Sequence, residues 1–265
     1  MTHPESAVQV QFLGSGDAFG SGGRLQSCIL VTHPAGRFLI DCGASAMISL
    51  RRFGVDPNSI DSIFITHLHG DHFGGLPFFI LDARLVSRRT APLLVAGPPG
   101  LAKRLPGAME ACFPGSWGAK RKFATDVREM EPRVSLPSGA VRVTPFIGLH
   151  PSGENAYSLR FEVGGRVISC TGDTEWTEAL AEAARGADLL IAEAYFYEKK
   201  VPFHLDYRTL VEKSAGLGIR RTVITHMSAD MLSKTGLAAC DVADDGKVFE
   251  VSGADSGLRS LPLGT

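Results

Sequence analysis

The sequence predicts an α/β fold in which two mixed β-sheets pack face to face and helices cover their outer faces, an αββα sandwich. Runs of β-branched and other apolar residues occur in both halves of the chain, and helical patterns lie between them. No linker, low-complexity tract or fixed-period repeat divides the 265 residues, a length that suits one large α/β domain. We therefore expect residues 1–265 to form a single domain with a core of about residues 8–251.

The first half contains strand patterns at residues 8–12, 28–32, 37–41 and 62–66. Gly14-Ser15-Gly16 predicts a turn after the first strand, and Pro34-Ala35-Gly36 predicts a hairpin between the second and third. A helical pattern at residues 44–53 stops at Gly54, as a C-terminal cap requires. Gly97-Pro98-Pro99-Gly100 indicates the start of a further helix.

The second half repeats this order of strands and helices. Gly164-Gly165 predicts a tight hairpin turn, and Thr174 is expected to cap the first turn of the helix that it begins. The helical patterns are at residues 174–185 and 207–216. The strand patterns are at residues 141–145, 156–163, 166–170, 188–193, 221–225 and 247–251.

Composition and charge exclude several classes of protein. With 44% hydrophobic and 21% charged residues, the chain has an ordinary composition for a globular protein with a buried core. No apolar run approaches the roughly 18 residues of a membrane span, and residues 1–5 do not begin a signal peptide, so we expect no membrane association. The net charge of −1 and the small, scattered basic groups do not favour a protein that grips a long nucleic acid.

The five cysteines are odd in number and widely spaced, and none forms a C-x-x-C pair. We expect them to be reduced and mostly buried, which suits a cytoplasmic protein. They are Cys28, Cys42, Cys112, Cys170 and Cys240.

A metal site is indicated by Thr66-His67-Leu68-His69-Gly70-Asp71-His72, which follows a strand pattern. His67 and His69 lie on one side of extended backbone, so both rings can reach one ion. We expect Gly70 to permit a sharp bend that brings Asp71 and His72 to a second ion. Imidazole and carboxylate ligands suit Zn²⁺, Mn²⁺ or Fe²⁺, and the absence of a nearby cysteine argues against a structural zinc site.

Three further ligand candidates, His150, Asp173 and His226, each follow an apolar strand pattern. With them the chain resembles hydrolases of the metallo-β-lactamase superfamily over nearly its whole length. The resemblance implies the metallo-β-lactamase fold and two divalent ions, zinc or else manganese or iron. It also implies seven ligands: His67, His69, Asp71, His72, His150, Asp173 and His226.

In this superfamily the two ions supply a bridging hydroxide as the nucleophile at neutral pH. The resemblance places Asp173 between the two ions. Asp71 could also accept the proton of the nucleophile, besides acting as a ligand.

A second group of residues narrows the resemblance to one branch of the superfamily. Ile191-Ala192-Glu193-Ala194 precedes a loop with His204, as in ribonuclease Z and the cyclic phosphodiesterase of the phosphonate pathway. Thr225-His226-Met227-Ser228 also matches this branch. The resemblance implies that His204 is a general acid or phosphoryl-binding group rather than a ligand, and that Glu193 orients its ring.

The chain departs from ribonuclease Z in one respect. The short form of that enzyme carries a long arm for tRNA between the third histidine and the bridging aspartate, whereas one strand hairpin joins His150 to Asp173 here. We therefore expect a phosphodiesterase for a small or nucleotide-like phosphodiester rather than for a large RNA.

Several alternatives stay open. They are a tRNA 3′-processing endonuclease without the arm, a lactone, ester or thioester hydrolase, and a non-catalytic metal-bound sensor. The Gly-rich loop at residues 14–24 either lines the site or forms a plain turn. The resemblance allows a homodimer, although no feature of the sequence requires one.

Overall fold

The computed structural model describes residues 8–252, and the first of its two sheets is built mainly from the N-terminal half. The strands of this sheet are β1 (Val8–Gly14), β2 (Cys28–His33), β3 (Gly36–Ile40), β4 (Ser62–Phe64), β5 (Leu93–Gly97), β6 (Thr125–Glu129) and β14 (Val248–Val251). Their spatial order is β14-β1-β2-β3-β4-β5-β6. Pairing is antiparallel from β14 to β3 and parallel from β3 to β6, so the sheet is mixed.

The second sheet is formed by the C-terminal half and is also mixed. Its strands are β7 (Leu136–Ser138), β8 (Val141–Gly148), β9 (Ala156–Val163), β10 (Arg166–Cys170), β11 (Leu189–Glu193), β12 (Thr222–Thr225) and β13 (Asp241–Val242). β7 to β10 pair antiparallel, and β10 to β13 pair parallel. Parallel neighbours need crossover connections, and these crossovers carry helices to the outer face.

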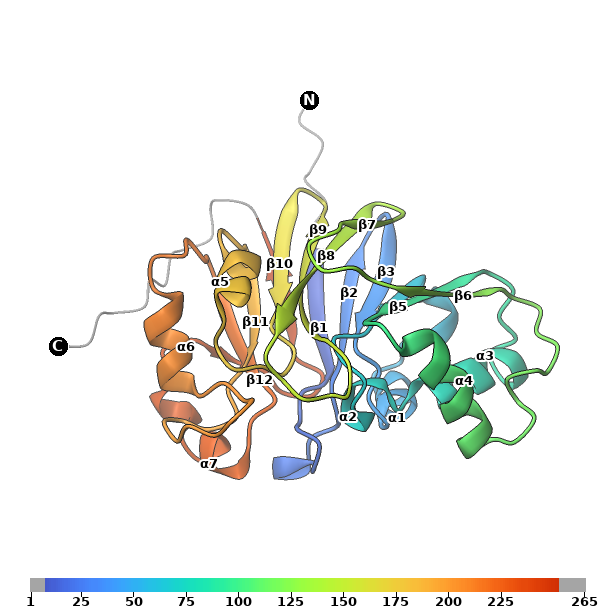
Figure 1. Ribbon diagram of the computed structural model, residues 1–265, viewed down its shortest axis with the longest axis horizontal. Coiled ribbons are helices and arrows are strands. Elements are labelled where there is room, and N and C mark those ends of the chain that lie inside the picture. The colour runs from blue at the N-terminus through green and yellow to red at the C-terminus, as the bar shows by residue number, and fades with distance from the viewer. Residues whose placement is uncertain (1–7, 253–265) are drawn as a thin grey trace.

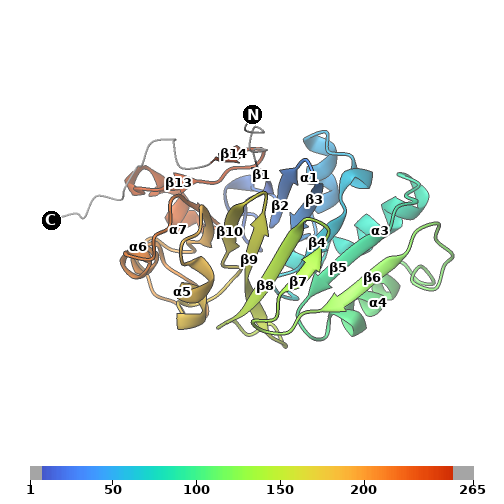
Figure 2. The same ribbon diagram turned by 90° about the horizontal axis from the view of Figure 1, so that it is seen from above.

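Helices cover the outer face of each sheet. They are α1 (Ala46–Arg52), α2 (Gly70–Phe73), α3 (Leu76–Leu85), α4 (Leu101–Cys112), α5 (Glu178–Ala184), α6 (Tyr207–Ser214) and α7 (Ala229–Leu232), with short 3-10 turns η1 (Ser21–Gly23), η2 (Pro57–Ser59) and η3 (Thr235–Leu237). α1, α3 and α4 share one apolar cluster with the first sheet, and α5, α6 and α7 share another with the second. Figures 1 and 2 show the two groups of helices on opposite sides of the sheets, which confirms the predicted αββα sandwich.

The inner faces of the two sheets meet in an aromatic core. The ring of Phe161 on β9 lies with its centroid 5.0 Å from that of Phe38 on β3 and 5.4 Å from that of Phe64 on β4. All three side chains are buried, and burial of each large apolar side chain contributes roughly 1.5–3 kcal/mol. These three rings are part of the large apolar cluster that joins the two sheets.

Several predicted element boundaries are wrong; the strand predicted at residues 141–145, for example, continues to Gly148. The predicted helix 174–185 begins at Glu178, because Thr177 accepts a hydrogen bond from Leu180 N and caps the helix. Thr174 instead accepts from the main-chain N–H of Leu149, so a tertiary contact uses its hydroxyl. The predicted strand 62–66 ends at Phe64.

The cysteines behave largely as expected. All five are free: Cys28, Cys42 and Cys170 are buried, Cys240 is half-buried, and Cys112 is exposed. Among residues 8–252, no helix has the length and apolar character that spanning a membrane requires.

Candidate metal centre

The seven predicted ligands meet at one edge of the sandwich, where strands of both sheets end. His67 and His69 follow β4, and Asp71 and His72 lie on α2, so the first sheet supplies four of them. The second sheet supplies the others, which follow β8, β10 and β12: His150, Asp173 and His226. Residues more than 150 positions apart in the chain therefore share one site.

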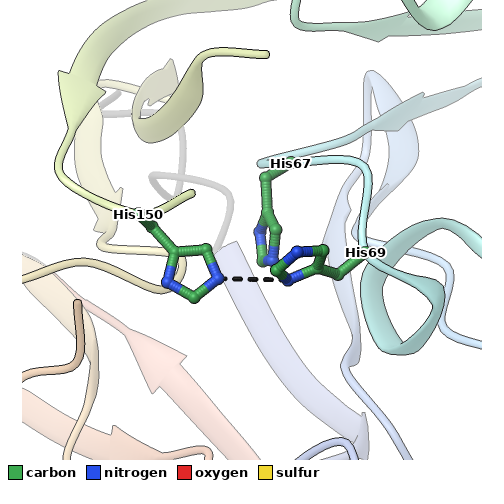
Figure 3. A group of neighbouring side chains, drawn as sticks. All are labelled: His67, His69 and His150. Carbon is green, nitrogen blue, oxygen red and sulfur yellow. Dashed lines mark hydrogen bonds between the residues drawn. The ribbon is translucent and has the colours of Figure 1, made fainter. Parts of the chain in front are cut away.

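The first group consists of three imidazole rings. His67, His69 and His150 each offer a ring nitrogen, and these atoms lie within 4.8 Å of one another. Nε2 of His150 is 3.1 Å from Nδ1 of His69. Figure 3 shows the rings of His67 and His69, from one loop, facing the ring of His150 from a second segment of the chain. Such a set of nitrogen donors could hold one divalent cation.

The second group combines two histidines and two carboxylates. His72 Nε2 lies 3.2 Å from Asp71 Oδ2 and 3.3 Å from Asp173 Oδ1. His226 Nε2 is 3.2 Å from the same oxygen of Asp71. All four side chains are buried and close enough to hold a second cation.

Asp173 lies between the two groups. Its Oδ2 is 3.5 Å from His226 Nε2 in the second group, 3.9 Å from His67 Nε2 and 4.0 Å from His150 Nε2 in the first. Gly172, directly before it, has φ +58°, and a Cβ there would lie 2.8 Å from the carbonyl oxygen of Tyr157. A glycine is therefore needed for Asp173 to reach this position.

Asp41 and Thr66 orient the rings of His72 and His67 through hydrogen bonds to their Nδ1 atoms. Asp41 Oδ2 accepts the Nδ1 proton of His72 at 2.7 Å. The hydroxyl of Thr66 donates to Asp41 at 3.0 Å, so its oxygen can accept the Nδ1 proton of His67 at 3.1 Å. This assignment of protons, made from the hydrogen-bond network, leaves Nε2 of both rings free to bind a cation.

The donor set fits a metal ion, because two of its atoms lack other partners. Nε2 of His67 and Oδ1 of Asp173 are buried and have no hydrogen-bond partner among the described residues. Buried polar atoms are nearly always satisfied, and a cation would satisfy both. Burial, together with His72, holds the pKa of His67 well below its usual range, so this ring is neutral and ready to bind.

The charges of the second group favour a cation as well. Burial lowers the pKa of His226, but the carboxylates of Asp173 and Asp71 outweigh it and raise the pKa to about 9. Burial also lowers the pKa of His72, but the carboxylates of Asp173 and Asp41 outweigh this effect and raise the pKa well above its usual value. The carboxylates therefore favour positive charge at this point, which either protons or a divalent ion can supply.

The chain turns at Gly70 as predicted, but without a conformation that only glycine adopts. It bends at extended His69 and enters the short helix α2 at Gly70, whose φ is not positive. The helical turn itself brings Asp71 and His72 inward. His226, by contrast, has φ +55°, a conformation that is uncommon for non-glycine residues.

His204 lies beside the metal groups and is oriented by Glu193. Its Nδ1–H donates to Glu193 Oε2 at 2.9 Å, and its ring centroid is 4.9 Å from that of His150. The other carboxylate oxygen of Glu193 accepts from the N–H groups of Thr174 and Leu205. His204, Glu193, Asp173 and His226 also lie close enough together to form a third potential ligand set.

Sequence reasoning missed two residues of the site. Asp41 follows an apolar strand directly, as Asp173 does, and this shared pattern could have revealed it. Tyr195 stacks on His204, with ring centroids 4.8 Å apart and an interplanar angle of 28°. No sequence pattern indicates that contact.

The Gly-rich first loop borders the site through its main chain. Ser15 O accepts from the N–H of His226 at 3.2 Å. Figure 1 shows the loop with η1 projecting from the edge of the sandwich where α2 and α7 lie.

The chain is similar to proteins of known family. The family model described as anti-Pycsar protein Apyc1 matches residues 8–246. A ribonuclease Z of Methanothermobacter thermautotrophicus is 27% identical over 308 aligned residues, which cover 94% of this chain and 98% of the relative.

Solved structures show the same fold. The metallo-β-lactamase fold protein YhfI of Bacillus subtilis superposes with a TM-score of 0.73 at 20% identity, covering 92% of this chain and 99% of that one. The short form of human tRNase Z gives a TM-score of 0.74 at 25% identity, covering 96% of this chain and 100% of that one.

Proposed function

The chain belongs to the family described as anti-Pycsar protein Apyc1, and we propose that it is a metal-dependent phosphodiesterase for a small or nucleotide-like phosphodiester. The observation that carries this proposal is the pair His204 and Glu193 next to two metal-binding groups. Hydrolysis of a phosphodiester releases an alkoxide, a poor leaving group that needs a proton donor. A positioned imidazole beside the metal centre meets that need.

The proposed ligands divide between two divalent ions, most simply zinc. His67, His69 and His150 would hold one ion, and Asp71, His72 and His226 the other, with Asp173 between them. Bound ions would supply Lewis acidity toward the phosphoryl oxygens and a water of lowered pKa. Manganese and iron also suit these imidazole and carboxylate donors.

The protein side chains have distinct proposed roles. His204 donates a proton to the departing oxygen from Nε2, while its Nδ1–H stays bonded to Glu193. Glu193 holds the ring in place, since its second oxygen is fixed by two main-chain N–H groups. Asp71 could accept a proton from the attacking water in addition to binding metal.

A small substrate is favoured over tRNA for three reasons. The alignment with the archaeal ribonuclease Z is 308 positions long, more than the 265 residues of this chain, so that relative contains segments without a counterpart here. β9 and β10 alone lie between His150 and Asp173, which leaves no room for an arm there. A net charge of −1 also gives little attraction to a polyanion.

The alternatives make different demands on His204. Hydrolysis of an activated ester, lactone or thioester depends less on a general acid, and a metal-bound sensor needs no such acid. A tRNA 3′-processing endonuclease without the arm would keep the same acid and differ only in its substrate. A homodimer stays a prediction that light scattering of the purified protein would test.

A panel of substrates tests the proposal. It contains bis-p-nitrophenyl phosphate, 2′,3′- and 3′,5′-cyclic nucleotides, precursor tRNA and an acyl lactone. We expect turnover of the small phosphodiesters. Preference for the lactone, or turnover of precursor tRNA alone, would reject the proposal in favour of the corresponding alternative.

A further inference from the structure

The loop that carries His204 is held against the metal centre through the main chain of Phe203. The N–H of Phe203 donates to Glu175 Oε1 at 2.7 Å. Its carbonyl accepts the Nδ1 proton of His150 at 2.9 Å. Both polar main-chain groups of the residue before His204 are therefore bound by side chains that border the metal centre.

Phe203 adopts a backbone conformation that needs such support. Its φ is +69°, in the left-handed region that favours glycine or asparagine. Its side chain is 40% exposed, so burial of the ring does not impose this conformation. Phe203 lies in a turn closed by the bridge between Val201 and His204, and its two main-chain hydrogen bonds fix that turn against Glu175 and His150.

Glu175 is itself anchored to the segment that precedes His150. Its N–H donates to Leu149 O at 3.2 Å, and Leu149 N donates in turn to the hydroxyl of Thr174 at 2.8 Å. The N–H of Thr174 donates to Glu193 Oε1 at 2.7 Å, the carboxylate that orients His204. Glu175 therefore holds the loop from a fixed position.

Three consecutive residues thus connect the metal groups with His204. Asp173 lies between the two groups, Thr174 supports Glu193, and Glu175 supports the residue before His204. A displacement of Phe203 would move His204 and also release the Nδ1 proton of His150.

We infer that Glu175 is a positioning residue, which fixes the His204 loop and the ring of His150 relative to each other. This inference rests on the proposed phosphodiesterase function and adds a residue to it. Glu175 has no contact with the reacting atoms in this role. It acts through the peptide groups of Phe203.

The test compares Glu175→Ala with Glu175→Gln, which keeps an oxygen that can accept from Phe203 N. Glu178→Ala, an exposed acid on α5, is the matched control. Hydrogen–deuterium exchange of the peptide covering residues 201–206 is measured without substrate. Turnover is measured on an alkyl and on a p-nitrophenyl phosphodiester, and thermal melting verifies that each variant is folded.

For Glu175→Ala we expect exchange in residues 201–206 to become about 10-fold faster, because a hydrogen bond to a charged acceptor is lost. Turnover of the alkyl substrate should fall about 10-fold, less than on removal of the acid itself, and turnover of the nitrophenyl substrate should fall less, because it depends on the ring of His150 but hardly on the acid. Glu175→Gln should keep exchange in residues 201–206 and turnover of the alkyl substrate close to those of the wild type, and Glu178→Ala should change neither.

Unchanged exchange in the folded Glu175→Ala protein would overturn the inference. So would faster exchange with equal losses on both substrates, since that pattern indicates a merely structural role. If the wild-type protein hydrolyses no phosphodiester, the proposed function fails, while the exchange data still decide whether Glu175 holds the loop.

Discussion

Asp41 accepts the Nδ1 proton of His72 at 2.7 Å, and both side chains are buried behind the metal centre. This bond fixes the ring so that Nε2 faces Asp71 and Asp173. Asp41 also accepts from the main-chain N–H of Thr66, at 2.8 Å. One carboxylate thereby orients a ligand from α2 and the segment that leads into His67.

Asp41→Ala should weaken metal binding at the second group. Loss of a carboxylate that orients a ligating histidine typically costs about 10–100-fold in metal affinity. Asp41→Asn should cost less, because its amide oxygen can still accept from His72. Competition with a chromophoric chelator measures the affinities, and the exposed Asp126→Ala on β6 is the control. Equal affinities in all four proteins would contradict the assigned role.

Elemental analysis should find about two divalent transition-metal ions per chain, as two separate ligand sets require. His226→Ala should lower this number to about one, because the first group does not contain that residue. His33→Ala, which removes a histidine outside the three potential ligand sets, should leave it unchanged. A single ion in the wild type, unaffected by His226→Ala, would refute the two-metal proposal.

His204→Ala should leave the metal content intact but slow turnover of an alkyl phosphodiester by roughly 10²–10⁴-fold, the usual effect of a positioned acid. A p-nitrophenyl substrate should suffer much less, because its leaving group hardly needs a proton. Glu193→Gln should also slow turnover of the alkyl substrate more than that of the p-nitrophenyl substrate, but by a smaller factor than His204→Ala. Loss of metal would instead identify His204 as a ligand, and equal losses on both substrates would indicate phosphoryl binding.

Phe161→Ala should destabilise the fold by about 3–5 kcal/mol, the usual cost of removing a buried aromatic side chain from a packed core. The ring contacts Phe38 and Phe64 of the opposite sheet, so its loss leaves a cavity between the sheets. Urea unfolding of the metal-free protein measures the change. Phe19→Ala, at a side chain that is 85% exposed, should change the free energy of unfolding little.

Binding to intact tRNA should be weak, and its affinity should fall steeply as the salt concentration rises. Filter binding between about 50 and 200 mM salt provides the measurement. Tight, salt-resistant binding with 3′-end processing would favour the tRNA endonuclease.

The ligand positions could be predicted because most of them are concentrated in one short motif or follow an apolar strand. His67, His69, Asp71 and His72 lie within six residues, and the positions of the others at strand ends were visible in the hydropathy. Five of the seven strands of the second sheet, β8 to β12, were predicted for a similar reason, since β9 and β10 flank the two glycines of a tight turn, whereas the short strands β7 and β13 were not predicted.

What could not be predicted depends on contacts between distant segments. Thr174 and Thr177 are equally good local caps, and the hydrogen bond from Leu149 N to Thr174 decides which of them begins α5. β6 has half-buried or exposed side chains only, so its sequence lacks the apolar run that marks an internal strand. The bond from Phe203 N to Glu175 joins residues 28 positions apart and leaves no local pattern.

Because the ligands come from both sheets, the site can be complete only after the chain has been synthesised as far as His226. A nascent chain that has left the ribosome as far as Asp173 contains the first group, but the second lacks His226, which follows β12. A protein shortened before this strand would therefore lack part of the second ligand group. Both ligand groups are therefore complete only after the chain has emerged beyond His226 and its two sheets have docked.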